Sequence, residues 1–111
     1  MPKNLVAASS VPLVLALLAR GESYGYALIQ QVRTLSDGDV EWTEGMLYPV
    51  LHRLEKDRLV EARWGRSPNG RRRRYYRITA SGRASLDVAR RQWSRVDATL
   101  RLAWEPSCPT T

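Results

Sequence analysis

The side chains best suited to chemistry lie in two basic stretches of the chain. His52, Arg53 and Lys56 fall within residues 42–57, and four consecutive arginines occupy positions 71–74. A guanidinium group donates forked hydrogen bonds to phosphate or to the edge of guanine, and an imidazole also reaches phosphates and base edges. These residue types predict binding of a polyanion.

The residues that enzymes and metal sites need are scarce. The chain has one histidine and one cysteine, Cys108, near the C-terminus. No His, Cys and carboxylate cluster has metal-ligand spacing, and no glycine-rich phosphate loop is present. Glu41 and Glu44 form an acidic pair beside a turn, which favours helix capping over acid–base catalysis. We therefore expect no enzyme activity, no metal and no cofactor.

Charge is distributed unevenly along the 111 residues. The chain has 18 basic and 11 acidic side chains and a formal net charge of +7. Residues 1–57 hold five basic and seven acidic side chains, a net of −2, whereas residues 58–111 hold thirteen and four, a net of +9. This imbalance favours a polyanionic partner such as nucleic acid. The alternative interpretation is an arginine-rich composition set by codon bias in a GC-rich genome.

Length and composition indicate a single globular domain. One cysteine excludes an internal disulfide, which suits a reducing cytoplasm. The longest apolar run, Val11 to Ala19, is too short to span a bilayer and lacks the basic residues that open a signal peptide. We expect a cytoplasmic protein with no membrane partner.

Residues 42–57 are expected to form the helix that presents the first basic stretch. Its apolar positions recur at helical spacing and are Leu47, Val50, Leu51 and Leu54. The opposite face carries Gly45, Pro49, His52 and Lys56, flanked by Tyr48 and Arg53. Thr43 can cap the start of this helix by accepting from a free backbone N–H. The helix is therefore half core and half polar probe.

Two helices are expected before it. Residues 1–9 are predicted to be a flexible arm, followed by a helix from Ser9 or Ser10 through Leu18. A second helix is predicted from Tyr24 to about Leu35, and residues 40–42 form either a brief strand or an extended link. The second helix, the link and the helix at 42–57 together resemble a helix-turn-helix.

After Arg58 the period of the pattern changes from 3.6 to about 2. Residues 59–64 and 71–78 predict two strands joined by a turn at 67–70, and Tyr75 and Tyr76 must point to opposite faces. Three helices followed by a basic hairpin outline a winged helix. The expected fold is mainly α with a small β-hairpin, with residues 10–79 as a winged helix-turn-helix DNA-binding domain.

Residues 80–104 predict a long last helix, and residues 105–111 a disordered tail. The apolar residues of this helix follow a heptad spacing and are Leu86, Ala89, Trp93, Val96, Leu100 and Ala103. A three-helix core is complete without them, so this seam is expected to pair with a second copy in a two-fold homodimer.

The candidate ligand-binding residues on the last helix are Trp93, Val96 and Asp97. Trp93 offers a ring for stacking, and the expected ligand is a small aromatic or cationic effector. Simple packing of Trp93 in the interface is the alternative. Asp97 can attract a cation or pair with Arg101 four residues later. Trp64 and Trp104 are weaker candidates for the same site.

The candidate DNA contacts come from three places: the start of the second helix, the helix at 42–57 and the hairpin. They are Tyr24, Thr43, Gly45, Tyr48, Pro49, His52, Arg53, Lys56, Arg71, Arg72, Arg73 and Arg74. Alternation along a strand lets about two of the four arginines face DNA, and such contacts make affinity fall steeply with salt. The alternatives are a solvated helix face, a charge run that deters strand pairing and, for Tyr24, packing beside the core.

Three motifs, in this order, resemble the PadR-like transcriptional regulators. They are SYGYAL at 23–28, LYPVLHRLEKD at 47–57 and GRRRRYYRITASG at 70–82, and the resemblance covers about residues 10–104. The single last helix resembles the compact branch of that family. Arg58 departs from the pattern, which usually has glycine there, and this predicts a helix exit that is less tight or more basic.

The resemblance implies a homodimeric winged-helix repressor that binds a palindromic promoter site on double-stranded DNA and is released by a small molecule or a stress signal. In some compact members an aromatic or cationic compound sits between tryptophans of the last helix, where Trp93 lies in this chain. Two alternatives stay open: a nucleoid-type protein that binds nucleic acid without sequence preference, and an adaptor whose basic hairpin meets an acidic protein.

Overall fold

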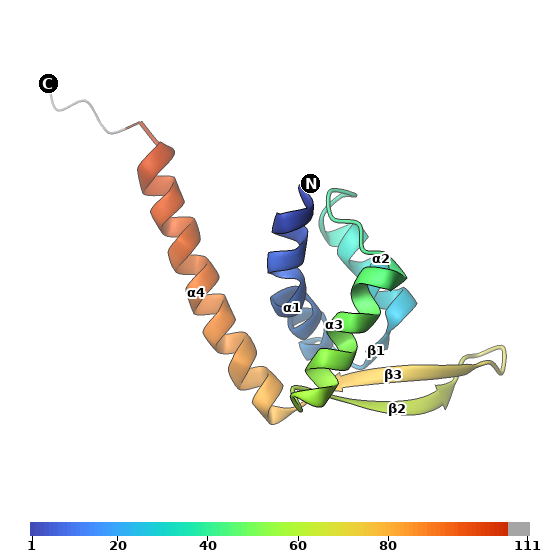
Figure 1. Cartoon of the computed structure of the whole chain (residues 1–111). Helices are drawn as coiled ribbons and strands as arrows, with labels where there is room; N and C mark the ends of the chain where they lie inside the picture. The colour runs from blue at the N-terminus through green and yellow to red at the C-terminus, as the bar shows by residue number, and fades with distance from the viewer. Residues whose placement is uncertain (107–111) are drawn as a thin grey trace, which may run out of the picture.

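The computed structural model describes residues 1–106, which form a helical body, a protruding hairpin and a long last helix (Figure 1). The elements in chain order are α1 (Lys3–Ala19), β1 (Ser23–Tyr24), α2 (Gly25–Leu35), α3 (Glu44–Lys56), β2 (Val60–Arg66), β3 (Arg72–Ile78) and α4 (Ala80–Trp104). The first three helices pack together, and α4 diverges from them (Figure 1). The predicted fold class, a mainly helical winged helix with a small antiparallel sheet, is confirmed.

The core joins the apolar stripes of α1, α2 and α3 to the base of the hairpin. Its most deeply buried side chains are Val14, Leu15, Leu18, Leu28, Val32, Leu47, Leu51, Leu54, Val60 and Tyr76. Each leucine fully removed from water contributes about 1.5–3 kcal/mol. This cluster therefore fixes α3 relative to the hairpin, which we call the wing (residues 60–78).

The sheet has three antiparallel strands in the order β1-β3-β2. Ser23 pairs with Tyr76 and Tyr24 with Tyr75, so Tyr24 belongs to a two-residue strand instead of opening the second helix as predicted. Tyr76 is buried and Tyr75 lies on the other, outer face, as the predicted alternation requires. Because β1 leads directly into α2, it ties the start of that helix to the wing.

The tip of the wing is closed by the predicted turn. The Gly70 N–H donates to the Ser67 carbonyl oxygen at 2.9 Å, and the Ser67 N–H donates to the Arg71 carbonyl oxygen at 2.8 Å. Gly70 has φ +86°, a left-handed conformation that glycine adopts without steric cost. These bonds fix the direction in which the arginines leave the turn.

The N-terminal segment is not the predicted flexible arm, because α1 begins at Lys3. The hydroxyls of Ser9 and Ser10 do not cap a helix; they donate to the carbonyl oxygens of Leu5 and Ala7, both at 2.8 Å. Val6 packs against the core, so the apolar face of the helix starts before the serines. This early contact with the core extends the helix upstream.

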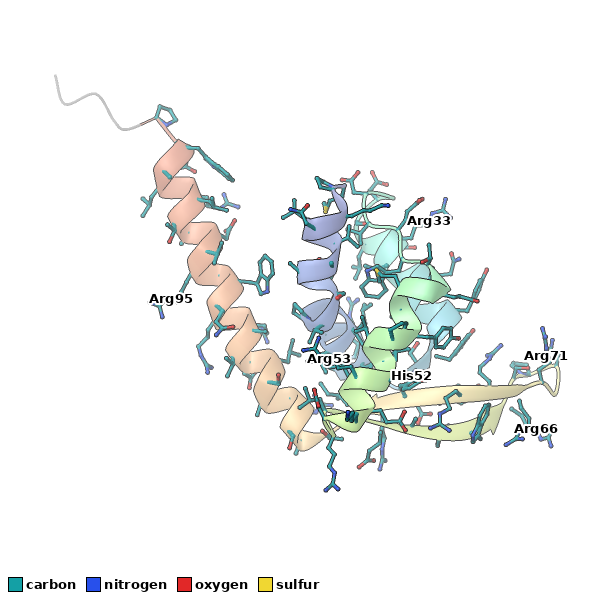
Figure 2. All side chains as sticks on the ribbon, viewed as in Figure 1. Arg33, His52, Arg53, Arg66, Arg71 and Arg95 are labelled. Atoms are coloured by element: carbon teal, nitrogen blue, oxygen red, sulfur yellow. The ribbon has the colours of Figure 1, made fainter. Side chains whose placement is uncertain are left out.

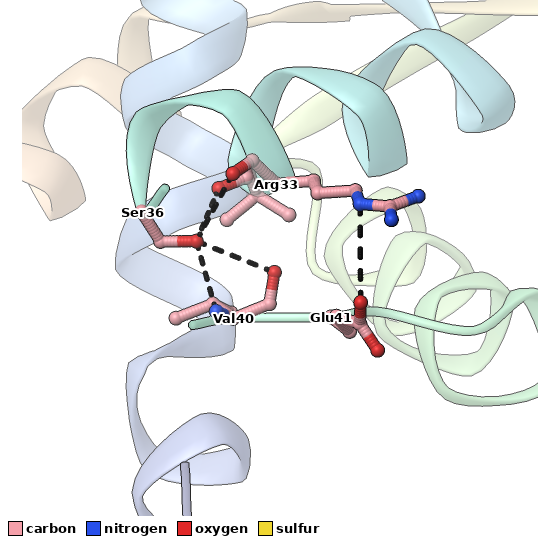
Figure 3. A network of polar contacts seen from close by, with 5 residues as sticks. Arg33, Ser36, Val40 and Glu41 are labelled. Atoms are coloured by element: carbon pink, nitrogen blue, oxygen red, sulfur yellow. Dashed lines mark hydrogen bonds and ion pairs between the residues drawn. The ribbon is translucent and has the colours of Figure 1, made fainter. Parts of the chain in front are cut away.

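An extended link joins α2 to α3, one of the two predicted alternatives. The Ser36 hydroxyl accepts a hydrogen bond from the Val40 N–H at 2.8 Å (Figure 3). The Arg33 guanidinium lies 3.8 Å from the Glu41 carboxylate across the same link (Figure 3). Trp42 is 3% exposed and holds the end of the link against the core. The start of α3 is thereby anchored.

The α3 helix ends in a tight motif centred on Arg58. The Leu59 N–H donates to the Leu54 carbonyl oxygen at 2.9 Å, and the Arg58 N–H donates to that of Glu55 at 3.0 Å. These bonds form a Schellman motif, which places Arg58 in the left-handed region at φ 59°. The exit is therefore tight, and Arg58 bears a steric cost that glycine avoids.

The α4 helix starts at a Thr79 cap, whose hydroxyl accepts from the Gly82 N–H at 3.0 Å. Leu86 is 7% exposed and belongs to the core cluster. Its assignment to the dimer seam is corrected, because the first turns of α4 pack on α1 and complete the core. Ala89 is half-buried, and every described residue from Arg90 onwards is exposed.

The predicted disordered tail, residues 105–111, lies mostly outside the described residues, which end at Pro106. Within residues 1–106, no helix is long and apolar enough to cross a membrane.

Candidate nucleic-acid interface

The outward face of α3 presents the polar residues predicted for it. Those exposed are Gly45, Pro49, His52, Arg53 and Lys56, while Leu47, Leu51 and Leu54 on the other side are buried. The Thr43 hydroxyl accepts from the Met46 N–H at 3.2 Å and caps the helix as predicted. Pro49 lies within the helix at an exposed position, where water can satisfy the carbonyl oxygen that loses its partner.

Tyr48 is less free than the rest of this face. It is half-buried, it packs against the core, and its hydroxyl lies directly against Gly25, where a Cβ would approach it to 2.6 Å. Its ring centroid lies 6.5 Å from that of His52. Tyr48 therefore joins α3 to the start of α2 and also forms part of the surface.

A groove of about 740 Å³ lies between α3, the start of α2 and the wing. It brings together the predicted contacts Tyr24, Tyr48, His52, Arg71, Arg72, Arg73 and Arg74, and it is also lined by Gly25, Tyr26, Trp64 and Tyr76. Thr43, Gly45, Pro49, Arg53 and Lys56 do not line the groove and extend the surface along α3. Figure 2 shows His52 and Arg53 on α3, and Arg66 and Arg71 at the far end of the wing.

The four consecutive arginines have different surroundings. Arg73 stacks over the Tyr24 ring at 3.7 Å, and Tyr24 meets Tyr75 edge to face at 5.8 Å. Arg74 donates to the Glu55 carboxylate of α3 at 2.9 Å. Arg71 is exposed, and no carboxylate among the described residues pairs with it. The arginine run therefore serves both the fold and the surface.

Trp64 belongs to this groove rather than to a site on the last helix. The Arg72 guanidinium lies 4.7 Å from the centroid of its ring, and that of Arg74 lies 5.2 Å away. The sequence predicted Trp64 only as a weaker candidate for binding the effector. The strand register across the turn was the available signal, because it places Trp64 directly opposite Arg74.

On the outer face of the wing, two arginines are paired with carboxylates. Arg63 donates to Glu22 at 2.9 Å, and Arg77 donates to Glu61 at 2.9 Å. The Arg63 hydrogen bond lowers the pKa of the Glu22 carboxyl, and the same bond raises the pKa of Arg63. Within the described part of the chain Arg73 pairs with no carboxylate, so the attraction for a polyanion comes from the arginine run that lines the groove.

The predicted effector residues lie on the exposed half of α4. Trp93 is 42% exposed and Val96 is 51% exposed, and together with Leu100 they form an apolar stripe. Asp97 accepts from Arg101 at 2.9 Å, and this is the ion pair predicted as the alternative to a cation site. Within the described part of the chain, no group of three His, Cys, Asp or Glu residues could hold a metal ion.

Comparison with known proteins places this geometry in context. Residues 14–88 match the model of the transcriptional regulator PadR-like family. A transcriptional regulator of Mycobacterium tuberculosis is 44% identical over 73 residues, which are 66% of this chain and 64% of that protein.

Solved structures share the fold over nearly the whole chain. A transcriptional regulator from Clostridium thermocellum superposes with a TM-score of 0.85 at 26% identity, covering 95% of this chain and 99% of that one. A PadR-like transcriptional regulator from Bacillus cereus gives a TM-score of 0.82 at 26% identity, covering 95% and 100%.

Proposed function

Because this chain belongs to the PadR-like family of transcriptional regulators, we propose that it is a sequence-specific, homodimeric repressor whose α3 helix enters the major groove of promoter DNA. The observation that carries the proposal is the shared groove. The polar face of α3 and the uncompensated arginines of the wing line one surface, on the side where carboxylates are few.

In the proposed complex, His52 and Arg53 meet base edges or phosphates. Exposed Gly45 and Pro49, which carry little side-chain bulk, allow the helix to approach the bases closely. Tyr48 reaches a phosphate or sugar from the edge of the groove, and the wing follows the flanking backbone.

The exposed stripe on α4 supports the homodimer. Trp93, Val96 and Leu100 are 42%, 51% and 41% exposed, on a helix whose distal half contacts no other described element closely enough to bury a residue. Contiguous exposed apolar surface of this kind marks an interface. To occupy two half-sites one DNA turn apart, the paired subunits must hold their α3 helices about 34 Å apart.

An effector bound between the α4 helices would act by changing this spacing. Such a switch requires that the effector bind the two states with different affinities. Trp93→Ala is expected to abolish the response of operator binding to an effector found by screening. An unchanged response would remove Trp93 from the proposal.

Fluorescence anisotropy of the full chain tests the DNA-binding proposal. The probes are a duplex from the region upstream of its own coding sequence and a scrambled duplex, each titrated across a salt series. Tight, upstream-selective binding that weakens with salt is the expected result. Equal affinity for both duplexes would identify a nucleoid-type binder instead, and no binding to either would favour a protein adaptor.

A further inference from the structure

The wing carries a large exposed aromatic side chain for which the DNA-contact prediction had no role. Trp64 is 55% exposed, and the strand register puts it on the same face as Arg72 and Arg74. Both guanidinium groups lie within the 6 Å at which a cation is attracted to an indole ring, at 4.7 and 5.2 Å. One ring therefore holds two arginines of the run.

These two arginines differ in their second partner. Arg74 is bonded at 2.9 Å to Glu55 of α3, and both side chains are only about one-third exposed, at 33% and 34%. Arg72 is exposed, lines the groove and pairs with no carboxylate among the described residues. Glu55 thus neutralises Arg74, while Arg72 keeps its full charge for an external anion.

This inference rests on the proposed DNA-binding function. We propose that Trp64 is a positioning residue, which holds Arg72 toward the groove to bind a phosphate. The Glu55–Arg74 pair holds the ring and the wing against α3. Because Arg74 is already paired with Glu55, it does not itself contact DNA. A guanidinium stacked on a ring keeps its edge N–H groups available as donors, so stacking and phosphate binding are compatible.

The physical gain from this arrangement is preorganisation. An arginine on an exposed strand samples many rotamers, and binding a phosphate must restrict them. The ring restricts the rotamers of Arg72 already in the free protein. Less side-chain entropy is therefore lost when the arginine binds a phosphate. Trp64 therefore raises affinity without adding a charge or a base contact.

A salt series on full-length variants separates phosphate contact from positioning. Arg72→Gln is expected to reduce the slope of log affinity against log salt by about 1.8 for the dimer, because each of the two subunits loses one phosphate contact worth about 0.9. Arg74→Gln is expected to weaken binding with no change in slope. Arg90→Gln, which removes the same charge from α4, is the matched control and should change neither quantity. A slope reduced equally by Arg74→Gln would overturn the division of roles.

A double-mutant cycle tests the role of Trp64. Trp64→Leu is expected to weaken operator binding about fivefold, while Trp64→Phe, which keeps an aromatic face, recovers most of the loss. In the Arg72→Gln background, Trp64→Leu should cost less than about twofold, because the residue it positions is gone. Full additivity of the two changes, or an unaltered affinity in Trp64→Leu, would overturn the proposal.

A measurement without DNA keeps this inference distinct from the proposed function. The side-chain NMR resonances of Arg72 and Arg74 are expected to show ring-current shifts that disappear in Trp64→Leu. Absence of these shifts in the native protein would overturn the stacking, even if the operator binds. Shifts that are present in a protein that binds no duplex would overturn the DNA-binding function itself, and the positioning role with it.

Discussion

Gly25 and Tyr48 meet where the start of α2 packs against α3, and one added methyl group tests that contact. A Cβ at Gly25 would lie 2.6 Å from the Tyr48 hydroxyl oxygen and 2.9 Å from Cζ of the ring. Favourable nonbonded contacts lie at about 3.5–4.0 Å. In Gly25→Ala the tyrosine ring must therefore retreat by about 1 Å, or the two helices must separate.

The two opposing contributions to stability can be compared. Replacing glycine by alanine in a helix normally stabilises a protein by about 0.5–1 kcal/mol. Overpacking a well-packed contact costs about 1–3 kcal/mol. We expect the overpacking to dominate at Gly25, for a net loss of about 1–2 kcal/mol, and each kcal/mol lowers Tm by about 4–8 °C in a domain of this size.

Thermal unfolding followed by circular dichroism provides the assay, at one fixed protein concentration because dimerisation would make Tm depend on it. Gly45→Ala is the matched control, since the nearest atom outside its own helix backbone, Thr43 Oγ1, would lie 3.9 Å from its Cβ. We expect this control to raise Tm. In Gly25→Ala, adding Tyr48→Phe should recover part of the loss, because the hydroxyl at the closest approach is removed. If Gly25→Ala is as stable as Gly45→Ala, the packing argument is refuted.

Three further expectations concern the helix exit, the dimer and the core. Arg58→Gly should raise Tm and increase the free energy of unfolding by up to about 1 kcal/mol, because glycine adopts the left-handed φ of 59° without the steric cost. A lower Tm in the same thermal assay would contradict this. Leu100→Asp should convert the dimer to a monomer in sedimentation analysis, whereas Leu102→Asp, at the 83% exposed position on the other side of α4, should not; equal effects would argue against the α4 stripe. Burial raises the pKa of the Tyr76 hydroxyl, so the folded state holds this proton more tightly than the unfolded chain, and stability should fall as pH rises above about 10; urea titrations of Tyr76→Phe should show a smaller loss over the same pH range, and an identical loss would remove Tyr76 as the cause.

The elements that local chemistry dictates were predicted from the sequence. Leu47, Leu51 and Leu54 mark the buried face of α3, because only helical spacing places them on one side. The Thr43 cap was predicted, since a threonine hydroxyl accepts from the free N–H groups of a first turn, and Thr79 caps α4 by the same chemistry. The turn residues likewise predicted where the wing lies along the sequence, because their preference for a turn is also a local property.

Features that depend on distant partners were not predicted. The two-residue strand at Ser23 and Tyr24 exists only because β3 is available to pair with it, and its own sequence carries no strand pattern. Leu86 fits the heptad seam as well as its neighbours do, yet it is buried because α1 lies beside the start of α4. The division of the arginine run likewise depends on Glu55 and Tyr24, which no spacing within the run reveals.

The charges of the wing are compensated near the body and uncompensated near the tip. Carboxylates pair with the arginines closer to the helices: Glu61 with Arg77, Glu22 with Arg63 and Glu55 with Arg74. Beyond them, the described residues supply no carboxylate to Arg66, Arg71 or Arg72, and like charges held this close repel one another. The turn bonds and the Trp64 ring hold the tip together against that repulsion. A phosphate backbone would remove the repulsion, so the part of the wing that is least favourable in the free protein is the part that gains most from binding DNA.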